Sequence, residues 1–302
     1  MHRHIPKNAV VALLLTTALF ALIGNTLTIM VMSRVRRMHA VLNYLIFNLT
    51  VADLLASLFC LTVDVTIEMK GRWIFGAAMC NVLLPLRALS VLASIFTLTM
   101  LSLTRCWAVV YPFRTQPNTC FAKISIASIW TGSCVLIVPY ISVLGYDDDI
   151  KMCTEDWSRA HSQLYTVLTS MFTYVLPVFT IASSYTRIVY ETSDMSRTRR
   201  FSTALMTTNK LAIAEQRSIL KLSVVISASF ALCSLPYHVV WVLYEFTDVH
   251  KHFVYFVDLA TLTYVLFYLN SALNPINYNI FSETFRRGSF ELFREILTRR
   301  YR

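Results

Sequence analysis

One carboxylate, Asp53, stands inside a long apolar stretch of the sequence, within the segment LTVADLL at 49–55. An isolated charge is costly in apolar surroundings, so this group needs either a bound cation or several hydrogen-bond donors. Further polar residues recur in the other apolar stretches, among them Asn25, Ser94 and Asn274. Hydroxyl and amide groups of this kind can bind a hard cation or complete a hydrogen-bond network.

Residue patterns that catalyse reactions are absent from the apolar stretches. These stretches contain neither a His-Glu-x-x-His motif nor a pair of catalytic carboxylates. We therefore expect that the chain is not an enzyme. A transporter or channel would require sequence repeats, paired broken helices or a polar pore, and it stays a remote alternative.

The composition indicates the solvent that surrounds these residues. Hydrophobic residues make up 56% of the 302 positions and charged residues only 15%, which excludes an ordinary soluble domain. About 20 apolar residues cross a bilayer as a helix, and no alternating strand pattern is present. We predict an all-α bundle of seven transmembrane helices that forms a single domain over 1–302. The predicted helices are 9–33, 41–66, 77–109, 122–145, 162–190, 218–246 and 253–281.

The distribution of charge predicts the orientation in the membrane. Most of the 27 Lys and Arg residues fall near one side, at 34–40, 105–123, 187–221 and after 282. By the positive-inside rule this side is cytoplasmic, and the N-terminal residues 1–8 are extracellular. We expect a multi-pass protein of the plasma membrane. The net charge of +10 then reflects topology, so no nucleic-acid partner is expected.

The seven cysteines differ in their predicted location relative to the membrane. By the predicted topology, only Cys80 and Cys153 lie on the oxidising side of the membrane. We therefore predict a disulfide between the outer end of the third helix and the second outer loop. The remaining cysteines lie within the spans, at their ends or near the cytoplasmic face: Cys60, Cys106, Cys120, Cys134 and Cys233.

Polar residues, prolines and a tryptophan mark the helices in a recognisable order. Along the chain they are Asn25 in GNTLTI, Asp53, Ser94, Arg105, Trp130, Pro177, Tyr185, Pro236 and the segment NPINY at 274–278. With these motifs the chain resembles the rhodopsin-like (class A) G-protein-coupled receptors, from Gly24 to the stretch after Ser282. The resemblance implies seven transmembrane helices and a short amphipathic eighth helix on the inner leaflet. We place that helix at about 283–296, with Phe285, Phe290 and Phe293 near one face.

The resemblance implies an ion site around Asp53. In the family this aspartate binds an allosteric sodium ion with help from the third and seventh helices. The matching residues here are Ser94, Asn270, Ser271 and Asn274. The alternative is a carboxylate satisfied by Asn25, Asn274 and water without an ion. No other cofactor is expected.

Residues that the family uses to transmit the signal are also present. A proline, an aliphatic residue and a phenylalanine pack beneath the ligand pocket, two tyrosines move inward on activation, and an Asn-Pro pair lies in the seventh helix. The matching residues are Pro177, Ile95 and Phe230, then Tyr185 and Tyr278, then Asn274 and Pro275. The tryptophan expected two residues before Pro236 is Ser234, which removes the usual rotamer switch.

On the cytoplasmic side of the membrane, the resemblance implies coupling to a heterotrimeric G protein and to arrestin. Arg105 matches the arginine of the family's acidic-Arg-aromatic triplet, but Thr104 replaces the adjacent acid. We therefore expect a weaker restraint on the resting state. In the second inner loop, Phe113 after Pro112 matches the apolar knob that inserts into the G-protein α subunit. A phenylalanine that only sits at the membrane interface is the alternative.

Two ligand classes are excluded by single positions. Aminergic receptors place an aspartate in the third helix, beyond the disulfide, to pair the ligand's ammonium group, and this chain has Arg87 there. Opsins need a lysine in the seventh helix for the retinal Schiff base, and 253–281 contains none. Neither an amine nor retinal is therefore expected as the ligand.

An acidic rim above aromatic residues predicts the ligand class. Acids gather at the outer loops and helix ends, where they would attract a cationic ligand. They are Asp64, Glu68, Asp147, Asp148, Asp149, Glu155, Asp156, Glu245, Asp248 and Asp258. Beneath them, Tyr237, His238, Trp241, Tyr264 and Tyr268 could line an aromatic pocket.

Two tracts indicate a particular group within this receptor family. The tract GRWIFG at 71–76 and the tract CTEDW at 153–157 resemble neuropeptide receptors of the RFamide, neuropeptide Y and tachykinin kind. In that group Glu245 stands where an acid meets an arginine of the peptide. We therefore expect a receptor for a short basic, amidated neuropeptide. The alternatives are a lipid or small organic acid whose carboxylate pairs with Arg87, or an Asp64 and Arg87 that only satisfy each other.

Overall fold

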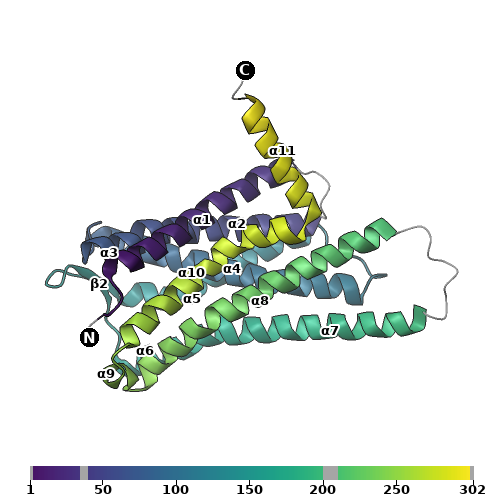
Figure 1. Ribbon diagram of the computed structural model, residues 1–302. Coiled ribbons are helices and arrows are strands. Elements are labelled where there is room, and N and C mark those ends of the chain that lie inside the picture. The colour runs from purple at the N-terminus through teal and green to yellow at the C-terminus, as the bar shows by residue number, and fades with distance from the viewer. Residues whose placement is uncertain (1–2, 35–39, 200–209, 300–302) are drawn as a thin grey trace.

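Seven long apolar helices run side by side and form one bundle (Figure 1). The computed structural model describes residues 3–34, 40–199 and 210–299. Within these residues seven helical segments are long and apolar enough to span a membrane, which confirms the predicted all-α seven-helix bundle. The segments are Lys7–Arg34, Val41–Lys70, Ala77–Val110, Thr119–Val143, Arg159–Thr192, Ser218–Phe246 and Phe256–Phe281.

Regular elements account for most of the described chain. The helices are α1 (Lys7–Arg34), α2 (Ala40–Phe59), α3 (Val65–Lys70), α4 (Ala77–Val110), α5 (Thr119–Val143), α6 (Arg159–Ser170), α7 (Leu176–Arg199), α8 (Lys210–Phe246), α9 (Val249–His252), α10 (Phe256–Phe281) and α11 (Glu283–Arg299). Two strands, β1 (Leu144–Asp147) and β2 (Met152–Glu155), form an antiparallel hairpin.

Local sequence explains several helix ends. Gly71, with a φ of 67°, ends α3 in the left-handed conformation that glycine adopts without strain. Asn118 caps α5, because its side chain accepts a hydrogen bond of 2.9 Å from the backbone N–H of Phe121. The second and fifth spans, Val41–Lys70 and Arg159–Thr192, each contain an internal irregularity.

A π-helical turn interrupts each of these two spans. The turn η1 (Cys60–Asp64) joins α2 to α3, and the turn η2 (Met171–Val175) joins α6 to α7. A π turn holds one residue more than an α turn, so it rotates the side chains that follow it. Hydropathy does not reveal such turns. In consequence, the side chains of Asp64 and of α7 face directions that the uninterrupted α-helical period would not give.

The end of the bundle on the left of Figure 1 we call the hairpin end; it consists of residues 3–6, 71–76, the β1–β2 hairpin and α9. Here Cys153 of β2 forms the predicted disulfide with Cys80 of α4. The backbone N–H of Trp73 also donates to Lys151 O at 2.8 Å. Both contacts hold the hairpin against the ends of the helices.

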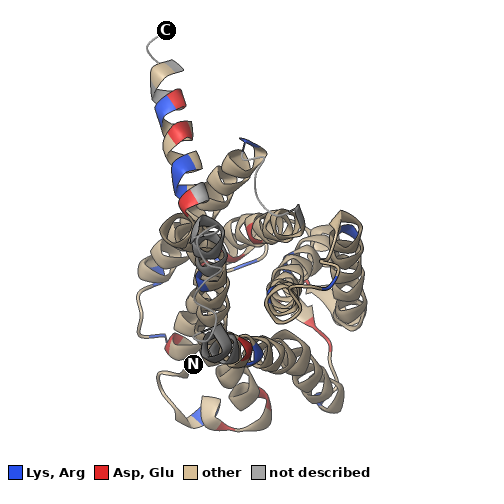
Figure 2. Cartoon of the chain, turned by 90° about the vertical axis from the view of Figure 1, so that its right-hand side faces the viewer, with Lys and Arg blue, Asp and Glu red and all other residues tan. Residues whose placement is uncertain are grey.

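The opposite end we call the basic end; it consists of residues 111–118, the ends of α7 and α8 that flank 200–209, and α11. Figure 2 looks onto this end and shows Lys and Arg alternating with Asp and Glu along α11. Arg34 of α1 pairs with Glu295 of α11 at 2.5 Å. On α11, Phe285 and Leu292 are buried, whereas Phe290 and Phe293 are 79% and 51% exposed. The three phenylalanines therefore do not share one face, because Phe285 packs into the bundle.

The largest apolar cluster occupies the half of the bundle near the basic end. It contains buried side chains from seven helices, among them Leu45, Leu98, Phe230, Tyr278 and Phe285. Other large apolar side chains point outward, as expected for helices in lipid. The close approach of α1 to α10 depends on Gly24, since a Cβ there would lie 2.9 Å from the side chain of Pro275.

Candidate functional site

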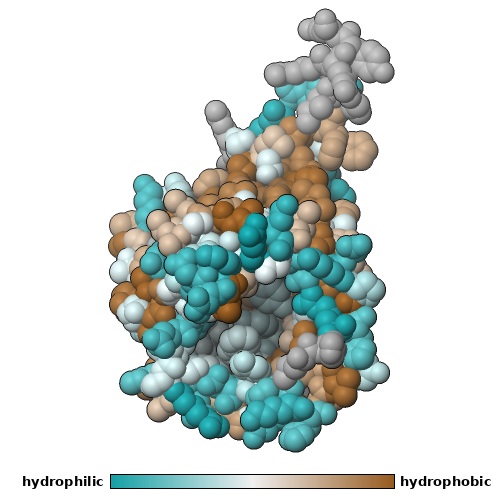
Figure 3. Space-filling view, turned by 90° about the vertical axis from the view of Figure 1, so that its left-hand side faces the viewer, coloured by the Kyte–Doolittle hydropathy of each residue, from teal (hydrophilic) through white to brown (hydrophobic). Residues whose placement is uncertain are grey.

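A hollow lies near the middle of the hairpin end, ringed by hydrophilic residues (Figure 3). Aromatic residues of α8 and α10 lie close together on this half of the bundle. The Tyr237 ring is 4.8 Å from Phe267, 6.1 Å from Tyr264 and 6.2 Å from Trp241. The Tyr264 and Tyr268 rings are 5.0 Å apart. The five aromatic residues singled out in the sequence therefore belong to one cluster, which we call the aromatic mouth: Tyr237, His238, Trp241, Tyr264 and Tyr268.

Two members of the aromatic mouth were missed in the sequence. Phe267 precedes Tyr268 and contacts Tyr237, and Tyr174 of η2 lies 5.0 Å from His238. The Tyr174 hydroxyl donates to Ala231 O at 3.1 Å. The π turn that carries Tyr174 leaves the hydropathy pattern unchanged, so no pattern in the sequence indicated Tyr174. The helical spacing along α10 could have indicated Phe267.

Arg87 of α4 takes part in a closed hydrogen-bond ring at this mouth. It pairs with Asp64 of η1 and also donates to the Tyr264 hydroxyl at 3.2 Å. Tyr264 donates to Tyr268 at 3.3 Å, and Tyr268 donates to Asp64 at 3.1 Å. Because a buried charge needs compensation, the ring satisfies both ions within the protein. A ligand carboxylate could bind Arg87 only by displacing Asp64.

Three further acids at the hairpin end are bound to the protein itself. Glu68 pairs with Arg3, and Asp258 accepts backbone N–H bonds from His4 and Ile5 at 3.1 Å. Asp248 pairs with Lys251 at 2.6 Å, and this ammonium lowers the pKa of that carboxyl. These acids therefore contribute less free negative charge than the composition of the rim suggests.

Glu155, Asp156 and Glu245 keep their charge free of any cation within the described residues. No ion pair joins them to Lys, Arg or His in that part of the chain. Glu245 is half-buried near the end of α8, where its backbone oxygen lies 3.5 Å from the amide nitrogen of Gln163. These three carboxylates, together with Asp147 and Asp149 at the tip of the hairpin, form no ion pair within the described residues and remain open to a cationic ligand.

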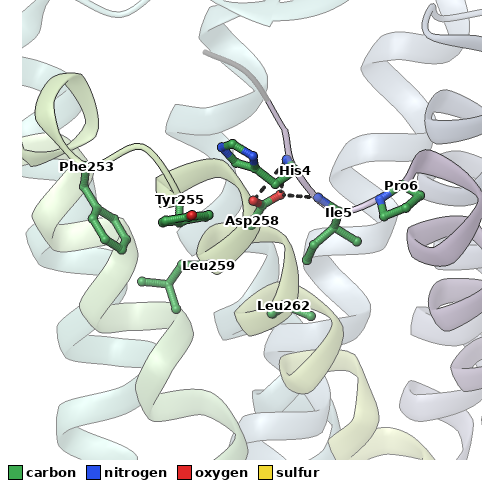
Figure 4. Close-up of a pocket in the computed structure, with 8 residues that line it drawn as sticks. All are labelled: His4, Ile5, Pro6, Phe253, Tyr255, Asp258, Leu259 and Leu262. Carbon is green, nitrogen blue, oxygen red and sulfur yellow. Dashed lines mark hydrogen bonds between the residues drawn. The ribbon is translucent and has the colours of Figure 1, made fainter.

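A pocket of about 530 Å³ lies beside the mouth, under residues 4–6 (Figure 4). In the close-up the Asp258 carboxylate points at the backbone of His4 and Ile5, and the His4 ring lies over Tyr255 at 4.7 Å. Leu259 and Leu262 line the pocket from α10. Residues 3–6, which we call the strap, thus close over the turns of α10 nearest the hairpin end.

Deeper in the bundle, Asp53 of α2 is fully buried and accepts three hydrogen bonds. The donors are Ser94 Oγ at 2.7 Å, Ser271 Oγ at 3.0 Å and Asn274 Nδ2 at 2.7 Å. Asn25 instead donates to the backbone oxygens of Ala21 and Ser271. The network therefore links α2 to α4 and α10 without using Asn25 as a donor to the carboxylate.

The surroundings of Asp53 fit a small hard cation. The amide oxygens Oδ1 of Asn270 and Asn274 are buried, and neither has a hydrogen-bond partner within the described part of the chain. Ser94, Asn270 and Ser271 line a void of about 20 Å³, which is enough for one water-sized particle. A carboxylate, two hydroxyls and two unpartnered amide oxygens are the ligand types that such an ion prefers.

The residues matched to signal transmission lie between the mouth and the basic end. Ile95 and Phe230 belong to the same apolar cluster, and Pro177 is buried in the first turn of α7. Ser234 is 1% exposed, and its hydroxyl has no hydrogen-bond partner within the described residues. The small side chain at this position lines the same void as Phe230 and Asn270.

At the basic end, Arg105 of α4 is half-buried, and its Nε has no hydrogen-bond partner among the residues that the structure describes. Thr104 donates to Leu101 O at 2.9 Å and gives Arg105 no charge partner. The Tyr185 hydroxyl lies 3.5 Å from Ser227 Oγ, and the fully buried Tyr278 ring stacks on Phe285 at 5.2 Å.

The second loop at the basic end exposes an apolar side chain. Phe113 has an exposure of 102%, so the loop leaves its ring entirely uncovered, and Pro112 before it is also exposed. Arg114 lies 4.9 Å from the Tyr111 ring centroid, and Arg187 donates to the Tyr111 hydroxyl at 2.8 Å. The loop is thus tied to α7 while Phe113 stays free for contact.

Comparison with known proteins agrees with this architecture. The family described as 7 transmembrane receptor (rhodopsin family) matches residues 24–278. Galanin receptor 2b of Danio rerio is 31% identical, over 94% of this chain and 74% of the relative. Neuropeptide FF receptor 2 of Rattus norvegicus is 27% identical over 90% and 69%, and a QRFP-like peptide receptor of Branchiostoma floridae is 27% identical over 91% and 75%.

These relatives confirm the expected resemblance to neuropeptide receptors, including those named for RF-amide peptides; galanin receptors were not anticipated from the sequence motifs. The matching family is one of receptors, which confirms that the chain is not an enzyme. The seven spans make it a multi-pass membrane protein. The chain therefore belongs to the rhodopsin family of seven-transmembrane receptors, the class A G-protein-coupled receptors, within the neuropeptide receptor group.

Proposed function

We propose that the chain is a plasma-membrane receptor that binds a short basic peptide at the hairpin end and activates a heterotrimeric G protein at the basic end. One observation carries the proposal: Glu155, Asp156 and Glu245 lack a cationic partner within the described residues and stand at the same end as the aromatic mouth. The relatives named for galanin, neuropeptide FF and RF-amide peptides support a peptide as the ligand.

The orientation follows from charge. Lys and Arg concentrate near the basic end, and such residues are retained on the cytoplasmic side of membranes. The hairpin end and the strap are then extracellular, which also suits the Cys80–Cys153 disulfide. A cationic peptide would reach the mouth from the side that carries the free carboxylates.

Binding would combine charge with aromatic contact. An acidic mouth raises the local concentration of a cationic ligand and its association rate. A guanidinium that pairs with Glu245 can also lie against the exposed Trp241 ring, which contributes a cation–π interaction. Short basic peptides offer both groups, whereas an organic acid would meet an Arg87 already paired with Asp64.

We further propose that a sodium ion binds beside Asp53 and favours the resting arrangement. Ser94, Asn270, Ser271 and Asn274 would hold the ion together with the carboxylate. The ion supplies a positive charge that compensates the buried carboxylate. Any state in which α4 and α10 separate from Asp53 would lose these ligands, so the ion would oppose activation.

Coupling would use the exposed groups of the basic end. Phe113 offers an uncovered apolar side chain to a G-protein α subunit, and Arg105 lies nearby in the last turns of α4. Arrestin would bind the same end. The missing acid next to Arg105 leaves the resting state with one restraint fewer than is usual in the family.

The test is a screen of amidated peptides against cells that express the chain, with calcium and cyclic-nucleotide readouts. Glu245→Gln should lower the potency of an arginine-containing agonist about tenfold or more, because a hydrogen bond to a charged group contributes about 1.5–3 kcal/mol. Asp248→Asn is the matched control, since Asp248 already pairs with Lys251. Unchanged potency of Glu245→Gln at equal surface expression would count against Glu245 as the anchor.

A further inference from the structure

We propose that the pocket between the strap and α10 binds a choline phospholipid of the surrounding membrane, by its headgroup and part of one acyl chain. This cavity of about 530 Å³ lies beside the aromatic mouth, and its volume is within the range of sites that hold small ligands. The proposed peptide site does not include it. The proposal therefore goes beyond the proposed function and does not depend on which peptide binds.

The wall that α10 contributes to the pocket faces the lipid. Tyr255, directly before α10, and Leu259 and Leu262 within it are spaced by four and three residues, so they follow one face of the helix. These three side chains, which we call the lipid stripe, are 40% to 56% exposed. Val265 and Tyr268 are instead buried in the cluster that α10 shares with α1. The lipid stripe is therefore the outward surface of α10 at the hairpin end.

The lipid stripe runs from the membrane interface into the hydrocarbon. Phe256 begins the seventh span, and the helical rise places Leu262 about 9 Å further along the axis. A tyrosine at the start of a span is typical of the interface between headgroups and hydrocarbon. A phospholipid at this position would place its headgroup beside Tyr255 and an acyl chain along Leu259 and Leu262.

Three aromatic rings surround the interface end of the pocket, as Figure 4 shows. The Tyr255 ring lies 4.7 Å from the His4 ring, with planes at 43°, and 6.1 Å from the Phe253 ring, with planes at 64°. Inclined aromatic rings around one space bind quaternary ammonium groups through cation–π interactions. The trimethylammonium group of choline is a cation of this kind.

Asp258 adds a negative charge to these rings. It lines the pocket and is 6% exposed, and among the described residues it forms no ion pair with Lys, Arg or His. Arg3 reaches α10 at Thr261, to which it donates at 3.2 Å, but its guanidinium pairs with Glu68. A buried charge is costly without a countercharge. A cation bound in the pocket would compensate Asp258.

The hydrogen bonds of Asp258 favour a quaternary cation over a primary one. Both carboxylate oxygens already accept backbone N–H groups, from His4 and Ile5 at 3.1 Å. A primary ammonium carries three N–H donors that need acceptors, whereas trimethylammonium carries none and requires only charge and aromatic faces. The pocket therefore suits phosphatidylcholine better than phosphatidylethanolamine, and the charge of Asp258 opposes anionic lipids.

The experiment measures lipid binding to the receptor purified in a sugar-headed detergent, by native mass spectrometry and by melting temperature. Phosphatidylcholine should be retained at least about fivefold better than phosphatidylethanolamine or phosphatidylglycerol with the same chains, and it should raise the melting temperature in a saturable manner. Tyr255→Leu keeps an apolar side chain but removes one ring, so retention of phosphatidylcholine should fall about fivefold. Leu262→Trp, which fills the pocket, should also lower it.

The matched control is Tyr190→Leu, at an exposed tyrosine of α7, which should retain phosphatidylcholine as wild type does. Glycerophosphocholine, which has the headgroup without acyl chains, should not displace the lipid at equal concentration.

Three results would overturn the assignment: equal retention of the three lipids by wild type, retention by Tyr255→Leu equal to that of Tyr190→Leu, or displacement by glycerophosphocholine, which would indicate a soluble ligand. Since no peptide is present, none of these results bears on the proposed peptide receptor.

Discussion

Asp53 connects α2, α4 and α10 through hydrogen bonds, so a substitution at this residue should alter the contacts among these three helices. Its carboxylate lies against Ser94 of α4 and against Ser271 and Asn274 of α10. Unpartnered amide oxygens of Asn270 and Asn274 complete a set of hard ligands. The residue is therefore the place where an ion could alter the balance between resting and active arrangements.

The sodium proposal gives a prediction at this residue. Replacing sodium by N-methylglucamine at constant ionic strength should increase the affinity of wild type for a peptide agonist, because the ion favours the resting arrangement. Asp53→Asn should remove the difference between the two salts. Agonist competition binding in membranes measures both. An identical affinity of wild type in either salt would contradict the ion site.

Arg105 gives a second prediction at the scale of a residue. Thr104→Asp would place a carboxylate beside an arginine whose Nε is buried and unpartnered, so it should stabilise the resting state. Signalling without ligand should then fall, by about tenfold if the bias changes by about 1.4 kcal/mol. Thr104→Asn is the control of equal size without charge. If Asp and Asn variants signal alike at matched surface density, the missing acid does not set the basal level.

At the scale of elements, two covering pieces tie the helix ends together. The hairpin is bonded to α4 through Cys80–Cys153, and the strap is bound to α10 through Asp258. Both fix loop segments at the hairpin end. The arrangement means that the site for the ligand depends on segments far apart in sequence.

The strap prediction concerns Asp258, which is 6% exposed and accepts N–H bonds from His4 and Ile5. Asp258→Asn removes the charge and one acceptor oxygen, so the solubilised receptor should lose about 1–3 kcal/mol and unfold at a lower temperature. Asp148→Asn at the exposed tip of the hairpin should not. Equal melting temperatures of wild type and Asp258→Asn would show that the strap contributes nothing to stability.

The disulfide prediction belongs to the hairpin. Cys153→Ser frees β2 from α4, so the hairpin would no longer be fixed against the ends of the helices. Peptide potency should fall strongly, or surface expression should be lost, since removing a native disulfide costs about 2–5 kcal/mol. Cys134→Ser, at an exposed free cysteine of α5, is the control. Full potency of Cys153→Ser would contradict the role of the hairpin.

The elements differ in how far the sequence predicts them. Hydropathy was sufficient for the seven spans, and topology for Cys80–Cys153, because both depend on local composition and on sidedness. The two π turns could not be predicted from the sequence, because one extra residue in a helical turn leaves the local composition unchanged. The bonds from Tyr268 to Asp64 and from His4 to Asp258 join residues 204 and 254 positions apart. Such pairs follow from packing, which a single sequence does not encode in any short pattern.

The whole molecule divides into a packed half and a receiving half. The largest apolar cluster gathers near the basic end, whereas aromatic rings and free carboxylates gather at the hairpin end. Asp53 and the void beside Ser94 lie between them along α4 and α10. The half near the basic end is therefore held by packing, including the contact of Tyr278 with Phe285.

The most direct measurement of the central claim is peptide-stimulated nucleotide exchange on a heterotrimeric G protein, in membranes that contain the chain. A basic amidated peptide, such as one ending in Arg-Phe-amide, should increase exchange in a saturable manner. Its analogue with citrulline in place of each arginine should be at least about tenfold less potent. Exchange that no basic peptide stimulates, or that the neutral analogue stimulates equally well, would contradict a receptor for a basic peptide.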